Sequence, residues 1–149
     1  MALTPESKGD PGWNATFGAF VIAAVATLGS LFFSEIMKLP PCSLCWYQRI
    51  FMFPLPVVLL VGLLPYDTRV ARYALPLALA GLGIALWHTL LYVGVLPEEA
   101  APCTQRVPCT QPTFTLGGIF SIPVLWLLAF ASVAGLLLYQ LYQRRRTTP

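Results

Sequence analysis

Four long runs of apolar residues constrain this 149-residue chain more than any other feature of its sequence. A helix needs about 20 mostly apolar residues to cross the hydrocarbon core of a bilayer. Apolar side chains make up 57% of the chain and charged ones only 10%, whereas soluble domains average about 25% charged residues. We therefore expect an all-α integral membrane protein, a four-helix bundle that forms a single domain over residues 1–149. The runs cover approximately Trp13–Phe33, Trp46–Leu64, Tyr73–Leu96 and Ile119–Tyr142.

The positively charged residues predict how the four spans are oriented. A nucleic-acid partner is not expected, because the charges sit between apolar runs and do not follow one polar face. With four spans, both termini and the middle connection share a side, and that side holds 6 of the 9 Lys and Arg residues. Cytoplasmic segments carry this excess, so we expect both termini in the cytoplasm and the connections 34–45 and 97–118 outside. No cleavable signal peptide is expected, because residues 1–12 lack a basic stretch before a short apolar core.

Four cysteines, Cys42, Cys45, Cys103 and Cys109, divide two and two between the connections that are expected to face outward. Disulfides persist on the oxidising side of a membrane, so Cys42–Cys45 and Cys103–Cys109 are the natural pairs. The ring closed by Cys42 and Cys45 is too short to stabilise the fold much. Such close spacing suits a bond that opens and closes, although a CxxC alone also occurs in metal sites and static bridges.

Neither of the common metal motifs matches these cysteines. A zinc site of four cysteines usually presents two CxxC pairs, but here five residues separate Cys103 from Cys109. A c-type haem needs a histidine directly after the CxxC, where this chain has Trp46. We therefore expect no metal.

Arg49 and His88 are ionisable residues at or within predicted spans, where such residues are often functional. Arg49 follows Cys45 by one helical turn, about 6 Å along the same helix face. Its guanidinium could extend to the lipid headgroups or donate hydrogen bonds to the carbonyl oxygen of a bound oxidant. His88 is the only histidine and lies in the outer half of the third predicted span. It could make an interhelical hydrogen bond or belong to a functional site.

The eight residues Cys42-Ser-Leu-Cys-Trp-Tyr-Gln-Arg49 form a specific pattern at the head of the second predicted span. With the four spans, the second outward cysteine pair and the segment Trp87-His-Thr-Leu-Leu-Tyr92, this pattern makes the chain resemble the DsbB family of bacterial disulfide bond formation proteins. The likeness covers nearly the whole chain and is greatest for the short-looped, BdbC-type members.

The resemblance implies an enzyme, a quinone-dependent protein-disulfide oxidoreductase that supports disulfide bond formation. It would reoxidise an extracytoplasmic thioredoxin-like thiol oxidase of the DsbA/BdbD type and pass the electrons to a membrane quinone, ubiquinone or menaquinone. The family relay implies that the partner attacks Cys103, that Cys109 exchanges with Cys42, and that Cys45 is left as a thiolate facing the quinone.

The resemblance also implies which residues hold the quinone. Arg49 would support the thiolate and a quinone oxygen, His88 would line the quinone site, and residues at the start of the fourth span, around Phe120–Pro123, would close it. The chain departs from the family in its short second outer loop, in Tyr92 where many members have Gln, and in Gln48 where others have Glu.

The implied location is the bacterial cytoplasmic (inner) membrane, crossed several times, with the cysteine loops facing the periplasm or the extracellular side. We expect a monomer. The alternative is a small structural membrane protein with static loop disulfides. A quinone reductase related to the vitamin K epoxide reductases fits less well, because those proteins place the CxxC on a later helix.

Overall fold

The computed structural model describes residues 10–64, 66–97, 115–116 and 120–147. The described part contains 4 helical segments that are long and apolar enough to cross a membrane, which confirms the predicted all-α membrane fold. These segments begin and end within four residues of the predicted runs. They are Pro11–Ile36, Ser43–Leu63, Val70–Tyr92 and Ile122–Arg146.

The first span is helix α1, Pro11–Leu31, extended by one π-helical turn, η1, at Phe32–Ile36. Pro11 occupies the first turn of α1, where its missing N–H would have had no partner in any case. After η1 the chain turns at Lys38, whose φ of 55° lies in the left-handed region. The extended segment Pro40-Pro41 then leads to the next helix.

The second span is broken into α2, Ser43–Met52, and α3, Pro54–Leu63. Phe53 lies at the junction in a turn. Pro54 and Pro56 cannot donate a backbone hydrogen bond to the preceding turn, which explains why the helix is interrupted here. Phe53 is partly buried and packs against the apolar core of the bundle.

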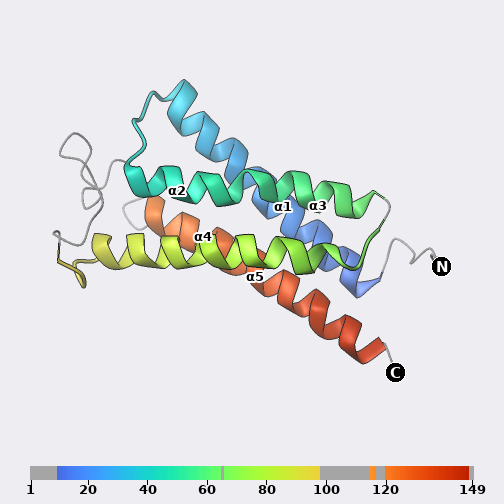
Figure 1. The fold of residues 1–149 in the computed structure, drawn as a ribbon. Helices are drawn as coiled ribbons and strands as arrows, with labels where there is room; N and C mark the ends of the chain where they lie inside the picture. Colours follow the sequence, from blue (N-terminus) through green and yellow to red (C-terminus); the bar gives the residue numbers. More distant parts are fainter. Residues whose placement is uncertain (1–9, 65, 98–114, 117–119, 148–149) are drawn as a thin grey trace.

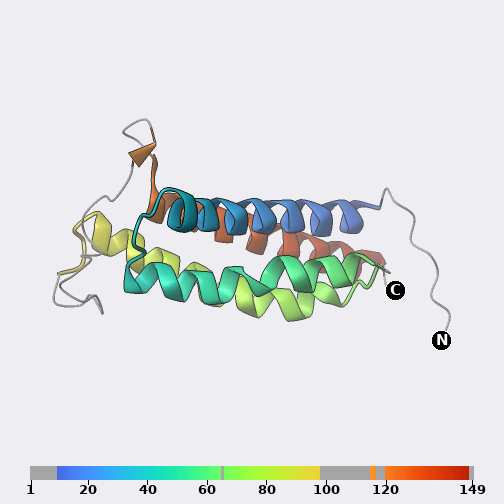
Figure 2. The same cartoon turned by 90° about the horizontal axis from the view of Figure 1, so that it is seen from above.

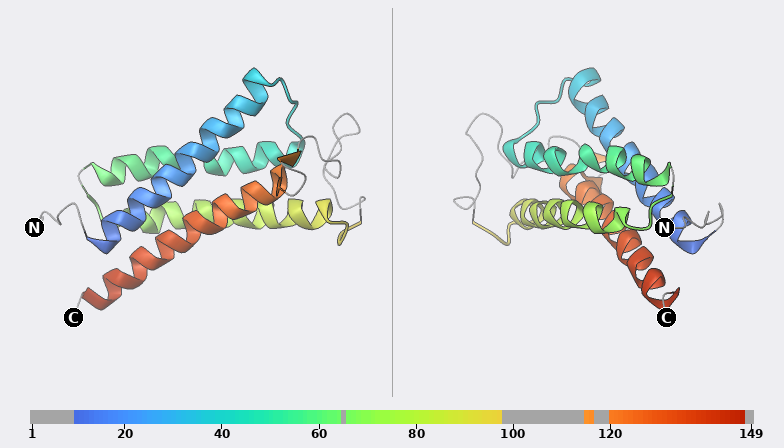
Figure 3. Two further views of the ribbon diagram at one scale, coloured as in Figure 1. Left: turned by 180° about the vertical axis from the view of Figure 1, so that it is seen from behind. Right: turned by 45° about the vertical axis from the view of Figure 1, so that its right-hand side comes forward.

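The third and fourth spans are α4, Val70–Tyr92, and α5, Ile122–Thr147. Directly before α5 lies the strand Phe120–Ser121 (β2), which pairs antiparallel with Thr115–Leu116 (β1). Helix α5 packs against α1 and α4, while α2 packs against α4 and α3 against α1. The start of α1, the α3–α4 connection and the end of α5 lie at one end of the bundle (Figure 1, Figure 3).

The opposite end of the bundle holds the start of α2, the end of α4 and the start of α5 (Figure 1, Figure 2). The chain therefore runs back and forth between two ends, as four spans require. At the end of the bundle that holds the start of α1 and the end of α5, one cavity is lined by Arg72, Arg144 and Arg145. Which end faces the cytoplasm stays a prediction from the charge distribution.

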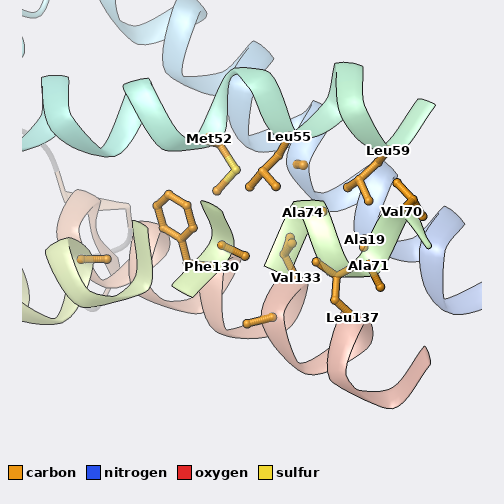
Figure 4. Close-up of a cluster of buried hydrophobic side chains, with 14 of the residues drawn as sticks. Ala19, Met52, Leu55, Leu59, Val70, Ala71, Ala74, Phe130, Val133 and Leu137 are labelled. Carbon is orange, nitrogen blue, oxygen red and sulfur yellow. The ribbon is translucent and has the colours of Figure 1, made fainter. Parts of the chain in front are cut away.

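Small residues let the four spans approach one another closely in the core, and Figure 4 shows the apolar side chains that fill it. Ala19 and Ala23 are fully buried, which lets neighbouring helices pack closely against α1. Gly81 of α4 faces the ring of Phe130 of α5, and a Cβ at this position would overlap the ring. A Cβ at Gly83 would have no other atom within 4 Å, so this glycine does not lie at a close contact between helices.

Candidate redox site

Cys42 and Cys45 lie together at the start of α2. Cys42 is the N-cap residue of the helix, with the extended backbone (φ −69°, ψ 168°) that is typical of this position. Its sulfur accepts a hydrogen bond from the backbone N–H of Cys45 at 3.4 Å. The two Sγ atoms are 2.9 Å apart, and both residues are free cysteines. The structure thus describes the dithiol form of the CxxC, with the sulfurs positioned for exchange.

His88 reaches this cysteine pair from α4. Its Nε2 atom lies 3.9 Å from Cys42 Sγ, although the two residues are 46 positions apart in the chain. The imidazole is 2% exposed, and its Nδ1 has no hydrogen-bond partner among the described residues. The packing of α2 against α4 therefore brings the only histidine of the chain to the cysteine pair.

The surroundings of Cys42 favour its thiolate. A hydrogen bond from the Cys45 thiol is the largest cause, and a hydrogen bond from His88 and the backbone N–H of Cys45 act in the same direction. Burial opposes them, because it disfavours the charged form. Together these effects lower the pKa of Cys42 from 9.0 to about 4. In the dithiol form Cys42 is therefore ionised at neutral pH.

Arg49 lies one turn after Cys45 in α2 and is only 8% exposed. Its Nη2 donates a hydrogen bond to the carbonyl oxygen of Ser30 on α1 at 3.0 Å. The guanidinium also lies over the Trp46 ring, 5.4 Å from the ring centroid. This burial rules out a side chain that extends freely to lipid headgroups. Its Nε is buried and has no hydrogen-bond partner among the described residues.

A small cavity of about 50 Å³ separates the cysteines from α5. Cys42, Cys45 and Arg49 all line it. A second, mostly apolar cavity of about 390 Å³ lies between α1 and α5. The two cavities adjoin, because they share the lining residues Ser30, Phe33, Ile122 and Trp126.

Comparison with known proteins identifies the family of this chain. The family model for the disulfide bond formation protein DsbB matches residues 13–140. The chain belongs to the DsbB family. This confirms the resemblance seen in the residues from Cys42 to Arg49. Membership, together with the four apolar helices, makes the chain a multi-pass bacterial membrane protein with a disulfide oxidoreductase role.

The relatives of this DsbB-family chain cover most of its length. A probable disulfide formation protein of Metapseudomonas resinovorans is 45% identical over 99% of this chain and 100% of its own. The disulfide bond formation protein C of Bacillus subtilis is 43% identical over 76% of this chain and 83% of its own. A probable disulfide formation protein of Deinococcus radiodurans is 41% identical over 88% of this chain and 90% of its own. No solved structure matches the chain significantly.

Four of the site residues that the sequence predicts lie in or against α2 in the described part of this DsbB-family protein. They are Cys42, Cys45, Arg49 and His88. His88 lies beside Cys42 and is not among the described residues that line the small cavity. Cys103 and Cys109, with their predicted disulfide, lie outside the described residues.

Two cavity-lining residues were not predicted from the sequence, Ser30 of α1 and Trp126 of α5. Nothing in the sequence distinguishes Ser30 from other small polar residues in membrane helices. Trp126 follows the segment 120–123, which the resemblance placed at the quinone site, by one helical turn. Ile122 lies within that segment and does line both cavities. Helical periodicity from Ile122 could therefore have suggested Trp126.

Proposed function

We propose that this DsbB-family protein is a quinone-dependent thiol oxidase. It reoxidises an extracytoplasmic thioredoxin-fold thiol oxidase of the DsbA/BdbD type and passes the electrons to a membrane quinone, ubiquinone or menaquinone. The single observation that carries the proposal is the contact between two cavities. The small cavity that Cys42, Cys45 and Arg49 line adjoins the larger apolar cavity between α1 and α5. A redox-active sulfur pair beside a cavity within the membrane needs a lipid-soluble electron acceptor.

The residues around the two cavities fit a quinone. A volume of about 390 Å³ with mostly apolar walls is in the range of sites for apolar ligands. Val21 and Val25 line this cavity and are 40% and 64% exposed on the surface of α1, so a lipid-soluble molecule can reach it from the bilayer. Arg49 offers N–H donors to a carbonyl oxygen next to Cys45. When bound, a quinone accepts two electrons and two protons and leaves as quinol.

The cysteines supply these electrons by thiol–disulfide exchange. We propose that a partner thiolate attacks Cys103, which releases Cys109 as a thiolate. Cys109 then attacks Cys42 and breaks the Cys42–Cys45 disulfide, which leaves Cys45 as a thiolate. The second thiol of the partner displaces Cys103 and completes the disulfide of the partner. Cys103 then attacks Cys109, which closes the Cys103–Cys109 disulfide, releases Cys42, and leaves the two electrons of the partner dithiol on Cys42 and Cys45.

The low pKa of Cys42 favours this direction of flow. Stabilising the thiolate stabilises the dithiol form, and a stabilised dithiol form makes the corresponding disulfide a stronger oxidant. The Cys42–Cys45 disulfide is thereby suited to draw electrons from the loop pair. His88, 3.9 Å from Cys42 Sγ, contributes to this stabilisation. A contact between His88 and the quinone stays a prediction.

The proposed orientation has both termini in the cytoplasm and the cysteine ends of the spans at the periplasmic or extracellular surface. The arginines that line a cavity at the opposite end, Arg72, Arg144 and Arg145, support it. With this orientation the loop cysteines can meet a partner outside the cytoplasm. Alkylation of single-cysteine variants with a membrane-impermeant maleimide in whole cells tests the orientation. Labelling at position 42 only after permeabilisation would refute it.

Turnover of the purified protein tests the function. A reduced DsbA-type thiol oxidase together with quinone should yield quinol and the oxidised partner in equal amounts. Cys45→Ser should abolish turnover, because no second sulfur remains to complete the CxxC disulfide. Ser34→Ala is the matched control, since among the described residues this hydroxyl bonds only within its own segment, to the carbonyl of Leu31 and to Glu35. Full turnover by Cys45→Ser would refute the proposal.

A trapping experiment separates this proposal from a structural protein with static disulfides. In Cys109→Ser the Cys103 thiolate can attack the disulfide of an oxidised DsbA-type protein, and Cys109 is not there to attack Cys103 and release the partner, so a covalent complex with the DsbA-type protein should accumulate. Cys103→Ser/Cys109→Ser is the control and should give no complex. A Cys109→Ser protein that forms no mixed disulfide would favour the static alternative.

A further inference from the structure

Three metal-ligating atoms meet at the start of α2. They are the sulfurs of Cys42 and Cys45 and the Nε2 atom of His88, which comes from α4. The ligand atoms of these three residues lie within 4.8 Å of one another, the only such group of His, Cys, Asp and Glu side chains in the described part of the chain. The sequence pattern did not predict this set, because His88 is 46 positions from Cys42.

The distances suit a tetrahedral metal after small side-chain movements. Zinc bonds of about 2.3 Å to sulfur and about 2.0 Å to nitrogen place the ligand sulfurs about 3.8 Å apart and a sulfur and nitrogen about 3.5 Å apart. The observed separations are 2.9 Å between the sulfurs and 3.9 Å between Cys42 Sγ and His88 Nε2. Shifts of about 1 Å in the two cysteine side chains would therefore complete the geometry.

The burial of the set also suits a bound metal. Cys42 is 7% and His88 2% exposed, so the ligands are already largely desolvated. The only polar contact of the His88 ring among the described residues is the one to Cys42 sulfur. The cavity of about 50 Å³ that Cys42 and Cys45 line has room for a water molecule as the fourth ligand.

We propose that the dithiol form of this protein binds one thiophilic divalent cation, such as Zn²⁺, through Cys42, Cys45 and His88. Binding forms two metal–thiolate bonds and one metal–imidazole bond, and any proton on the two sulfurs passes to solvent. No electron is transferred. Two thiolates and one imidazole are a common ligand set for zinc, with the fourth position left open.

The site exists only in the reduced protein. In the Cys42–Cys45 disulfide neither sulfur is a thiolate, and a single imidazole does not hold the cation. Metal binding and disulfide formation therefore exclude each other. A bound cation keeps the pair reduced and blocks exchange at Cys42. This goes beyond the proposed function, because it requires neither a quinone nor a partner protein.

Cobalt titration of the full-length protein in detergent tests the site. The Cys103→Ser/Cys109→Ser variant keeps only Cys42 and Cys45, so no other thiolate contributes. After anaerobic reduction and removal of the reductant, one equivalent of Co²⁺ should give the intense visible bands of tetrahedral thiolate coordination, and Zn²⁺ should abolish them. The oxidised protein should give no such bands. Absence of the bands in the reduced protein would overturn the proposal.

The part of His88 in the site is tested by exchange of this ligand. His88→Gln should raise the Kd for Zn²⁺ at least about tenfold, since even loss of a residue that only supports a ligand costs 10- to 100-fold. His88→Cys supplies a third thiolate and should restore tight binding with a changed cobalt spectrum. Thr89→Ala is the control, because its hydroxyl bonds to the carbonyls of Ala85 and Pro123 and not to the cysteines.

Each outcome decides the site separately from the proposed function. An unchanged Kd in His88→Gln would overturn the three-ligand site, and a Kd that His88→Cys fails to restore would assign His88 a structural role only. Binding is read from the cobalt spectrum and not from turnover. A protein that binds Zn²⁺ when reduced but does not reduce quinone would refute the proposed function and support the metal site.

Discussion

The ionisation of Cys42 makes a prediction whose size can be worked out from the site. A thiol with the ordinary pKa of 9.0 is about 1% ionised near pH 7, whereas a pKa of about 4 makes Cys42 almost fully ionised. This raises the thiolate population about 100-fold. The same fall in pKa lowers the intrinsic nucleophilicity of the thiolate by about 100- to 300-fold, given a Brønsted coefficient of about 0.4–0.5. The two effects nearly cancel, so the alkylation rate at one pH is not informative.

The pH profile of alkylation is the informative measurement. With only the Cys42–Cys45 pair present, the rate of iodoacetamide modification at Cys42, read by mass spectrometry, should be flat from about pH 5 to about pH 8. It should fall as the pH drops toward 4, the pKa of Cys42. The Cys42 thiolate also stabilises the folded dithiol form in a pH-dependent way. This stabilisation is fully present above the pKa of Cys42 in the unfolded chain and is lost as the pH falls through about 4.

Variants of Cys45 show whether its hydrogen bond is the main cause. Cys45→Ala removes the donor and should move the midpoint of the profile up toward the ordinary thiol pKa. Cys45→Ser keeps a hydroxyl donor and should retain a low midpoint. The reasoning would be refuted if, in the protein with the intact Cys42–Cys45 pair, the alkylation rate at Cys42 still rose between about pH 8 and about pH 9. Such a rise would show that Cys42 is an ordinary thiol.

Four further predictions concern packing and Arg49. Gly81→Ala places a Cβ against the Phe130 ring and should destabilise the protein in detergent by about 1–3 kcal/mol in denaturant unfolding, and a smaller cost would mean that the ring moves aside. Gly83→Ala has no atom within 4 Å of the new Cβ and should be neutral or stabilising by up to about 1 kcal/mol in the same assay. Arg49→Ala should raise the apparent KM for quinone by about 10-fold or more, because hydrogen bonds to charged groups contribute about 1.5–3 kcal/mol. An unchanged KM would reject the role of Arg49 at the quinone. Arg49→Lys keeps the charge but loses the paired donors, so its KM should lie between those of the wild type and Arg49→Ala.

The sequence predicted the fold well because hydrophobic length is a strong constraint in membranes. Each span could be located by its apolar run, since unpaired backbone groups are too costly in lipid to permit much else. The break at Phe53 was foreseeable only as a kink at Pro54 or Pro56. The π-helical turn Phe32–Ile36 carries no signal that distinguishes it from the end of an ordinary α-helix.

The candidate site was predictable only in part, for a physical reason. The CxxC and Arg49 lie close together in the chain, so helical spacing alone places them on one face. The contact between His88 and Cys42, and the bond from Arg49 to Ser30, depend on how α4 and α1 rotate against α2. That rotation is set by the packing of many small residues, which periodicity in one helix does not determine.

A single turnover without a partner protein tests the central claim most directly. The Cys103→Ser/Cys109→Ser variant is reduced, freed of reductant under anaerobic conditions and mixed with ubiquinone or, separately, menaquinone. We expect one quinol per protein from at least one of the two quinones, with complete formation of the Cys42–Cys45 disulfide, and no quinol from the same protein carrying Cys45→Ser. A reduced pair that persists beside unreacted quinone of either kind would contradict the account.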